Sequence, residues 1–436
     1  MIAGGGALRG EPSSFRTMRI LLILCLSEAL LCLGIFGYSC KDNHHHAKDH
    51  HEDDHVTASY LSKNISSLQK ITPGNIKFAY RLYTHLATKY PSDNIFFSPI
   101  SISMAFSMLS AGAKGQTQTE ILEGLGFNTS SVSQEDIHRG FHQFISILEA
   151  SNRDVQLHTA NALFVQKDQK LLEEFLEDLN VFYHSKATST DFHNAKKAKS
   201  KINKYVAENT CGKISNLLDT IDPNTLLILV NTIYFKGDWE TPFKTLQGKS
   251  DFHVDDNTVI KVKMMSSKGT HRVADDKEIG CTVVEIPYHG NVSAILVLPD
   301  KGKLHEVEKA LQSLPLPHLM EKRLIHLLVP KFSISPSLDL KEELSEMGMV
   351  KVFSGDADLS GINGVHNLLV SKAIHKSVVS VNENGTEAAG ATAIGVVATS
   401  VATVPIITMD RPFLMTILDK STRTILFAGR IMRPEN

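Results

Sequence analysis

The chain has little cysteine for its length. It contains 5 cysteines in 436 residues, and Cys25 and Cys32 both fall in one apolar run near the N-terminus. The other three, Cys40, Cys211 and Cys281, are too few to build a disulfide framework for so long a chain. Since 42% of the residues are hydrophobic, we expect a large apolar core to hold the fold and the cysteines to be isolated thiols.

The chain also has little net charge, and it lacks the sequence motifs of serine hydrolases and serine proteases. The chain carries 45 Lys and Arg against 47 Asp and Glu, and a formal net charge of −2 provides no long-range attraction to nucleic acid. It has no GxSxG nucleophile elbow and no GDSGG string. We therefore expect no enzyme activity, no cofactor and no nucleic-acid partner.

One long apolar run, residues 20–36, follows Met18 and an arginine, and Glu28 interrupts it. A basic residue ahead of a short apolar run is typical of a secretory signal peptide, with Met18 as initiator and cleavage near Ser39 and Cys40. An uncleaved membrane anchor is the alternative, although 17 residues is short for a spanning helix. We expect residues 1–39 to be an extension and signal, and the mature protein to be secreted, extracellular and free of the membrane.

A histidine-rich segment comes next. Residues 40–55, CKDNHHHAKDHHEDDH, hold six histidines and five acids without an apolar face, so we expect residues 40–70 to be a disordered tail. The string HEDDH at residues 51–55 matches the HExxH zinc-protease motif, which works only on a stable helix inside a cleft. Loose metal capture is an alternative to a merely solvated tail, and its candidate ligands are His44, His45, His46, His50, His51 and His55.

The stretch 383–412, ENGTEAAGATAIGVVATSVATVPIITMDRP, has an unusual composition. Residues 385–409 contain no Lys or Arg, and Glu387 is their only charge. Gly, Ala and β-branched residues without a 3.6-residue period argue against a helix, and an ordinary loop would hold more polar turn residues. The stretch suits a strand that enters the middle of a sheet, where a buried unpaired charge would cost several kcal/mol. A plain Ala/Gly-rich linker is the alternative.

Residues 71–436 read as one domain in which helical patterns come first and strand patterns later. This order, without regular βαβ alternation, predicts an α+β fold. Residues 226–235 form a continuous apolar run, typical of a strand buried on both faces, with Asn231 inside it. We expect helices at 76–87, from Pro99 onward, and at 117–125, 134–149, 171–183, 194–209, 304–314 and 338–347, and strands at 155–165, 226–235, 259–265, 281–287, 293–298, 325–333, 368–381 and 424–431.

Seven segments resemble those of the serpin family in order and spacing: NIFFSPISISMAF, LVNTIYFKGDWETPF, PKFSIS, MGMVKVFS, DLSGI, AIHKSVVSVNENGTEAAGA and DRPFLMTI. The resemblance covers residues 71–434 and is strongest to the α1-antitrypsin-like secreted inhibitory members. It implies a serpin fold, with about nine helices around three β-sheets and an exposed reactive-centre loop at about 383–410. It also implies a monomer whose loop is cleaved by a serine protease and then inserts into the central sheet.

The resemblance assigns roles to particular residues. The hinge of the loop would comprise Glu383, Gly385, Thr386, Glu387, Ala388, Ala389, Gly390 and Ala391. A polar cluster where the sheet opens, which the family calls the shutter, would comprise Ser98, Ser101, Asn231 and His375. Trp239 would lie at the top of the sheet, where insertion begins, and a salt bridge there between Lys331 and Glu383 would contribute about 1 kcal/mol.

The family's usual spacing, counted from Thr386, puts the cleaved bond between Thr399 and Ser400, to within two residues. The neighbouring residues are small or β-branched, which suits an elastase-like pocket better than a pocket built for arginine. A chymotrypsin-like protease is the second choice. We do not expect heparin activation, because the helix at 134–149 offers only Arg139, His138 and His142 as basic residues.

Two further expectations concern function and modification. A non-inhibitory serpin that carries a small apolar ligand, such as a hormone, is the alternative function, but such members tend to have bulky or charged hinges. Glycosylation sequons occur at Asn64, Asn128 and Asn291, which we expect to be modified. A fourth, at Asn384, lies in the hinge, where a glycan would block insertion, so we expect it to stay unmodified.

Overall fold

A computed structural model describes residues 54–150, 155–311, 320–386 and 404–434, with side chains from residue 67 onward. The described residues form nine α-helices and three sheets, which confirms the predicted α+β serpin architecture. The helices are α2 (Asp54–Lys89), α3 (Pro99–Ser110), α4 (Gly115–Gly124), α5 (Gln134–Ala150), α6 (Glu173–Tyr183), α7 (Ala195–Asn209), α8 (Leu304–Lys309), α9 (Leu340–Glu346) and α10 (Ser360–Asn363), with a 3₁₀ turn, η3 (Lys351–Phe353). None of the helices described here is long and apolar enough to cross a membrane.

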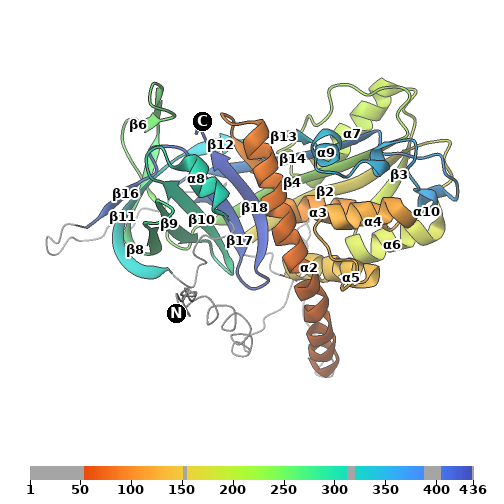
Figure 1. Ribbon diagram of the computed structural model, residues 1–436, viewed down its shortest axis with the longest axis horizontal. Helices are drawn as coiled ribbons and strands as arrows, with labels where there is room; N and C mark the ends of the chain where they lie inside the picture. Colours follow the sequence, from red (N-terminus) through yellow and green to blue (C-terminus); the bar gives the residue numbers. More distant parts are fainter. Residues whose placement is uncertain (1–53, 151–154, 312–319, 387–403, 435–436) are drawn as a thin grey trace, which may run out of the picture. The chain divides into compact units, whose positions relative to one another are not determined.

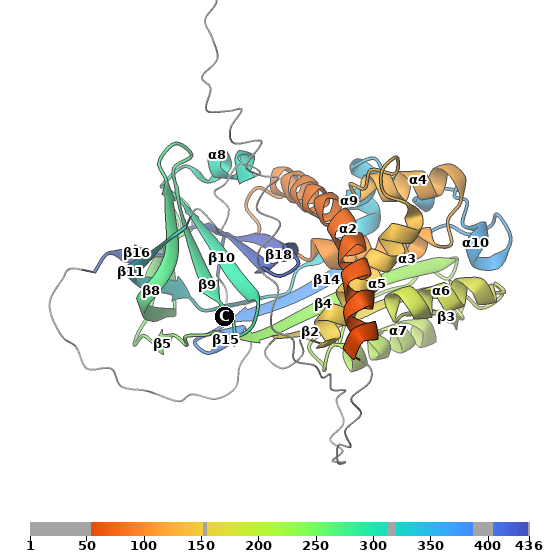
Figure 2. The same ribbon diagram turned by 90° about the horizontal axis from the view of Figure 1, so that it is seen from below.

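The central sheet has seven strands. Its order is β12 (Phe332–Ile334), β14 (Lys372–Val381), β15 (Gly385–Thr386), β4 (Leu227–Asp238), β2 (Val155–Gln166) and β3 (Lys186–Thr190), and β13 (Ser337–Asp339) pairs with β14 off this path. Strand β4 is buried along nearly its whole length, as its apolar run predicts. Figure 2 shows helices α3, α4, α6 and α7 gathered around this sheet.

A nine-stranded sheet forms the other half of the domain (Figures 1 and 2). Its order is β1 (Ile95–Phe97), β18 (Thr424–Ile431), β17 (Phe413–Asp419), β10 (Val292–Pro299), β9 (Cys281–Pro287), β8 (Met264–Asp276), β11 (Glu321–Pro330) and β16 (Ile406–Thr408), with β5 (Lys244–Thr245) on β8. A small third sheet pairs β6 (Ser250–His253) with β7 (Val259–Val262). Strands β3, β5, β6 and β16 have two to five residues, too few to give a periodic sequence signal.

The two faces of the central sheet are covered by different helices. Helix α7 packs Ile202 and Val206 against Ile228 and Val230 of β4. Alternate residues of β4 point the other way, toward α3, which is buried at every position. Ser98 caps α3, because its hydroxyl accepts a hydrogen bond from the Ser101 N–H at 3.3 Å. Lys196, Lys197, Lys201 and Lys204 are exposed, so they lie on the outer side of α7, whose inner side covers the sheet.

Helix α2 begins much earlier than expected. It starts at Asp54, whereas the expected helix starts at residue 76 and the expected tail ends at residue 70. Ser67 and Leu68 are buried, so the packed domain already includes residues that we expected to be disordered. Pro73 lies inside the helix. Because proline is disfavoured in the interior of a helix, the sequence pattern indicates a helix only after this residue. His55 lies in the first turn of α2, and the other candidate histidines of the tail fall outside the described residues.

Candidate functional site

Two hinge residues, Gly385 and Thr386, already form a strand of the central sheet, β15. Strands β14 and β4 pair directly and in parallel from Lys372 and Ile228 up to Val378 and Tyr234. Beyond Val378 and Tyr234, toward the C-terminal ends of both strands, β15 lies between β14 and β4. There Thr386 pairs with Val381 of β14 and with Gly237 of β4. The sheet is therefore open at one end, and the hinge occupies the opening.

Gly385 is required for this close approach. A Cβ atom on Gly385 would lie 2.1 Å from the Gly237 carbonyl oxygen and 2.6 Å from the Asp238 Cα atom. Both contacts are with backbone, which cannot turn aside as a flexible side chain could. Any other residue at 385 would push β15 out of the opening.

Thr386 is fully buried and hydrogen-bonded. Its side chain has no exposed surface, and its hydroxyl lies 2.8 Å from the Tyr288 hydroxyl. The ring of Tyr288 stacks on Trp239, with a centroid distance of 4.2 Å. Sequence reasoning did not find Tyr288, because only the tertiary structure brings the connection after β9 under the hinge.

Trp239 holds the turn that leads into β15. Its indole N–H donates to the Asn382 carbonyl at 3.0 Å, and its backbone N–H donates to the Asn384 carbonyl at 2.8 Å. The side chain is 1% exposed, and it lies at the opening of the central sheet, as the family resemblance implies. Asn384 is half-buried within this turn.

Lys331 and Glu383 meet beside the opening. The Lys331 ammonium lies 2.8 Å from one carboxylate oxygen of Glu383 and 3.0 Å from the other. Thr245 also donates its hydroxyl to Glu383 at 2.9 Å. Partial burial opposes ionisation of Glu383, but the hydrogen bonds from Lys331 and Thr245 prevail and lower the pKa of the carboxyl.

The shutter residues lie together below the opening. His375 of β14 and Asn231 of β4 are register partners, and the His375 Nδ1–H donates to the Asn231 side-chain oxygen at 2.5 Å. The Ser98 backbone N–H donates to His375 Nε2 at 3.1 Å, which fixes this neutral tautomer. The Asn231 amide donates to the Ser101 hydroxyl at 2.6 Å.

Asn161 is a third strand residue of this network, and the resemblance did not supply it. It is the register partner of Asn231 on β2, and its side-chain oxygen accepts from Asn231 at 2.5 Å. An asparagine within the apolar run of β2 was a visible signal, but its partner depends on strand register. His375, Asn231 and Asn161 thus form one row across three strands, and the bond between the first two crosses the junction of β14 and β4.

Acid should destabilise the protein through His375. Complete burial lowers the pKa of His375 to about 3, from an ordinary value near 6.5. Below pH 6.5 the His375 side chain is therefore protonated in the unfolded chain but stays neutral in the folded chain. The free energy of unfolding is thus highest above pH 6.5 and decreases as the pH falls toward 3. Between pH 7 and pH 5 we expect a loss of about 2 kcal/mol from this group, measured as a fall in the urea midpoint.

His375→Gln provides the control for the acid effect. The variant should be less stable at pH 7 but lose less stability between pH 7 and pH 5 than the parent. His138, whose pKa burial lowers to about 4, remains in both proteins and contributes equally. An equally steep loss in the variant would contradict the assignment to His375.

Other expected site residues divide into two groups. Asn128 and Asn291 are exposed in turns, where a glycan could attach, and Asn64 lies within α2. Glu387, Ala388, Ala389, Gly390, Ala391, Thr399 and Ser400 lie outside the described residues. The chain on either side of them is placed: Thr386 ends β15 in the central sheet, and β16 pairs with β11 in the nine-stranded sheet. The expected loop therefore connects two sheets.

Comparisons with known proteins agree with this architecture. Residues 73–434 match the family described as Serpin (serine protease inhibitor). The chain is 41% identical to an alpha-1-antiproteinase of Bos taurus over 94% of this chain and 97% of that protein, and 41% identical to serpin A3-3 of Bos taurus over the same shares. Its structure is similar to that of human thyroxine-binding globulin complexed with thyroxine, with TM-score 0.79, 39% identity and coverage of 85% of this chain and 100% of that one.

Human kallistatin is a further structural relative, with TM-score 0.78, 36% identity and coverage of 85% of this chain and 99% of that one. The match to the family covers the opening, the shutter and all three sheets. The chain belongs to the serpin family, within its α1-antitrypsin-like members.

Proposed function

We propose that the chain is a secreted suicide-substrate inhibitor of serine proteases with an elastase-like target. The observation that carries this proposal is the position of β15, whose Gly385 and Thr386 already pair between β14 and β4. A loop that begins inside the sheet can extend downward after cleavage without a change of register. The alpha-1-antiproteinase relatives support the inhibitory class.

Insertion requires β14 and β4 to separate below the hinge. Seven register pairs join them there, from Lys372 with Ile228 to Val378 with Tyr234. The inserted loop would lie antiparallel to both strands, as β15 does, and would pair on both edges. Each new ladder bond contributes about 1 kcal/mol net, and burial of apolar side chains adds to this drive.

The protease supplies the acyl chemistry. Its serine attacks the carbonyl of the residue before the cleaved bond, proposed as Thr399, and forms an acyl-enzyme while Ser400 becomes a new N-terminus. If the loop inserts before the acyl-enzyme is hydrolysed, the protease moves with the loop, to which it is covalently bound, and its structure is distorted. The protein itself needs no catalytic residue or cofactor in this scheme.

Incubation with four proteases tests the proposal. Pure mature protein would be mixed with neutrophil elastase, pancreatic elastase, chymotrypsin and trypsin, and denaturing gels and mass spectrometry would identify complexes and cleaved bonds. We expect an SDS-stable complex with an elastase, cleaved within two residues of Thr399, and none with trypsin. Cleavage without a complex, and without a rise in melting temperature, would contradict inhibition.

Transport of an apolar ligand is the second candidate, favoured by the similarity to thyroxine-binding globulin. A cavity of about 90 Å³ lies beside α3 and α5, lined in part by Met104, Phe144, Leu148 and Leu157. Pockets for drug-sized ligands have volumes of roughly 300–1,000 Å³, so this cavity is too small for such a ligand. Thyroxine titrated against the protein before and after loop cleavage distinguishes the two functions, because a carrier would bind it without any protease.

A further inference from the structure

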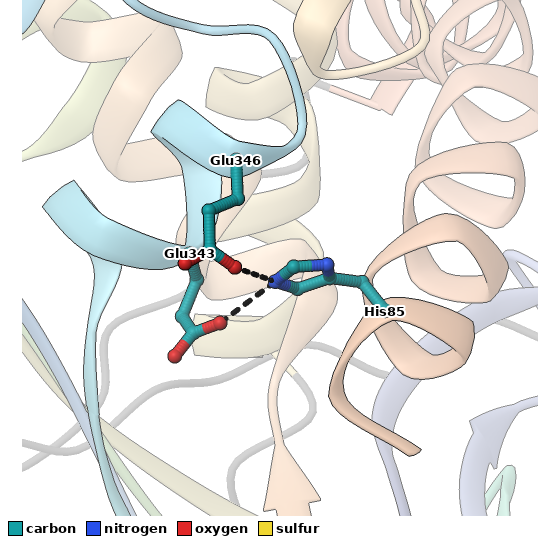
Figure 3. Close-up of side chains that lie close together, drawn as sticks. All are labelled: His85, Glu343 and Glu346. Atoms are coloured by element: carbon teal, nitrogen blue, oxygen red, sulfur yellow. Dashed lines mark hydrogen bonds and ion pairs between the residues drawn. The ribbon is translucent and has the colours of Figure 1, made fainter. Parts of the chain in front are cut away.

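A second polar cluster joins α2 to α9, outside the site described above. His85 lies near the end of α2, and Glu343 and Glu346 lie one helical turn apart on α9 (Figure 3). His85 Nε2 is 2.8 Å from Glu343 Oε2 and 3.3 Å from Glu346 Oε2. One atom from each of the three side chains thus lies within 4.8 Å of the others, which makes the cluster a candidate metal site.

The spacing of these three atoms is near that of ligands around a tetrahedral metal ion, since two separations are 2.8 and 3.3 Å and all three lie within 4.8 Å. Zinc binds histidine nitrogen and carboxylate oxygen at about 2.0–2.1 Å, which places neighbouring ligand atoms about 3.3 Å apart. The two distances from His85 Nε2 are already close to that edge length. Small rotations of the two glutamates would therefore bring all three atoms around one ion.

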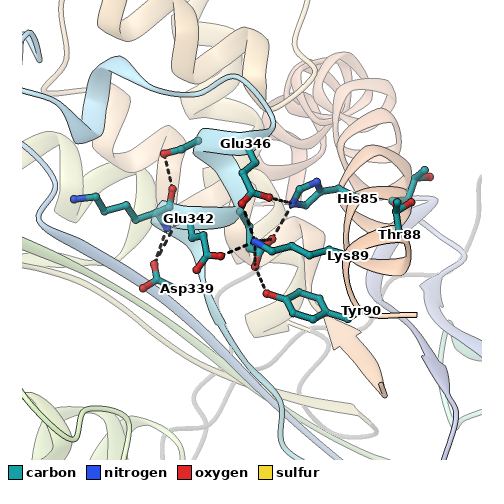
Figure 4. A network of polar contacts seen from close by, with 11 residues as sticks. His85, Thr88, Lys89, Tyr90, Asp339, Glu342 and Glu346 are labelled. Atoms are coloured by element: carbon teal, nitrogen blue, oxygen red, sulfur yellow. Dashed lines mark hydrogen bonds and ion pairs between the residues drawn. The ribbon is translucent and has the colours of Figure 1, made fainter. Parts of the chain in front are cut away.

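The other oxygens of the same glutamates are held by Lys89 and Tyr90, and Lys89 also reaches Glu343 Oε2 at 3.4 Å. Lys89 lies 2.9 Å from Glu346 Oε1 (Figure 4). Tyr90 donates its hydroxyl to Glu343 Oε1 at 2.8 Å. Each carboxylate therefore points one oxygen at His85 and keeps the other on Lys89 or Tyr90. Such outer contacts orient metal ligands, and they can remain in place when an ion binds.

The His85 cluster has a net negative charge and too few hydrogen-bond donors for its carboxylate oxygens, and both features favour binding of a cation. Glu342, Glu343 and Glu346 surround the single ammonium of Lys89, so the group carries two excess negative charges when His85 is neutral. Glu343 is only 2% exposed, so one of these charges is buried. Neutral His85 can give at most one hydrogen from Nε2, although two carboxylate oxygens face that nitrogen.

We propose that His85 Nε2, Glu343 Oε2 and Glu346 Oε2 bind a zinc ion that fastens α2 to α9. An imidazole with two carboxylates suits zinc and related transition metals rather than calcium or magnesium, which prefer oxygen ligands alone. Glu346 is 47% exposed, which gives the ion access and leaves the fourth position to water. Because α9 packs on β14, the ion would brace the strand that must move during insertion.

Zinc titration of the full mature chain tests the site. The six tail histidines would first be replaced by Gln (His44, His45, His46, His50, His51 and His55), because they could bind zinc on their own. We expect calorimetry to show one zinc ion per chain, and cobalt(II) to give the visible bands of a tetrahedral centre. Absence of zinc binding would overturn the proposal and leave the cluster as an ion-pair network.

Two glutamates of α9 provide a matched pair of variants. Glu346→Gln removes a proposed ligand, whereas Glu342→Gln removes a carboxylate that contacts Lys89 and has no contact with His85. Both side chains are largely exposed, so neither variant should fail to fold. We expect Glu346→Gln and His85→Gln to weaken zinc at least about tenfold, and Glu342→Gln to change it much less. Equal weakening by both glutamate variants would overturn the site in favour of general acidic attraction.

Discussion

Replacing Thr386 with arginine should turn the proposed inhibitor into a substrate. Thr386 has no exposed surface and sits against Tyr288, so a guanidinium there would be a buried, unpaired charge. Before cleavage the chain can avoid the cost of burying the guanidinium by moving β15 out of the sheet into solvent. After insertion position 386 is covered by the sheet, and the charge cannot escape.

The buried charge of the arginine raises the free energy of the loop-inserted state and of the transition state that leads to it. A penalty of about 3 kcal/mol slows insertion about a hundredfold relative to deacylation. The number of inhibitor molecules consumed per protease inactivated should rise sharply, and the SDS-stable complex should nearly disappear while cleavage continues. Active-site titration of the elastase with parent and variant measures both quantities.

Thr386→Ser is the matched control. It keeps the hydroxyl that contacts Tyr288 and adds no charge, so its stoichiometry of inhibition should stay near that of the parent. If Thr386→Arg still forms the complex in parental yield, then insertion does not pass through position 386, and the proposed role of β15 is incorrect.

Replacing Asn231 with alanine should have the largest effect on stability. Asn231 is fully buried and bonds to Ser101, Asn161 and His375 at distances of 2.5–3.0 Å. Removing it leaves several of those groups without partners, at about 1–3 kcal/mol for each unsatisfied group. We expect a total loss of about 3–5 kcal/mol, seen as a lower urea midpoint and a lower melting temperature.

The same variant should also open the sheet more easily. The bond from His375 to Asn231 joins the two strands that insertion separates, so its loss removes one barrier to opening. During incubation at moderate temperature, the uncleaved variant should convert faster to loop-inserted or oligomeric forms, visible on native gels.

Asn94→Ala separates these two effects. Asn94 makes three hydrogen bonds to the backbone of Met432 and Arg433, and its side chain bonds to neither β14 nor β4. Its removal should lower stability without faster conversion. Conversion at equal rates in both variants would show that general destabilisation, rather than the shutter bond, governs opening.

Patterns that depend on local sequence were predicted well. The apolar run of β4, the helix that begins at Pro99 (α3), and the order of helices before strands all follow from spacing and propensity. The start of α2 was predicted poorly, because its first turns are polar and Pro73 interrupts the pattern. Buried Leu68 shows that tertiary packing, rather than propensity, sets where the domain begins.

The partners of the functional residues could not be found in the same way. Asn161 and Tyr288 are ordinary in the sequence, and they join the site only because strand register places one beside Asn231 and a connection places the other against Thr386. The pairing of His85 with Glu343 likewise joins residues 258 positions apart.

By itself the sequence determined that one domain of mixed helices and strands contains, before its last strands, an almost uncharged, small-residue stretch suited to entering a sheet. That much follows from composition and period, which act over a few neighbouring residues. Only the tertiary structure decided that Gly385 and Thr386 already lie between β14 and β4, because that position depends on two strands distant in sequence and on a gap that admits glycine alone. Long-range register and close packing set this arrangement, and no local pattern encodes either.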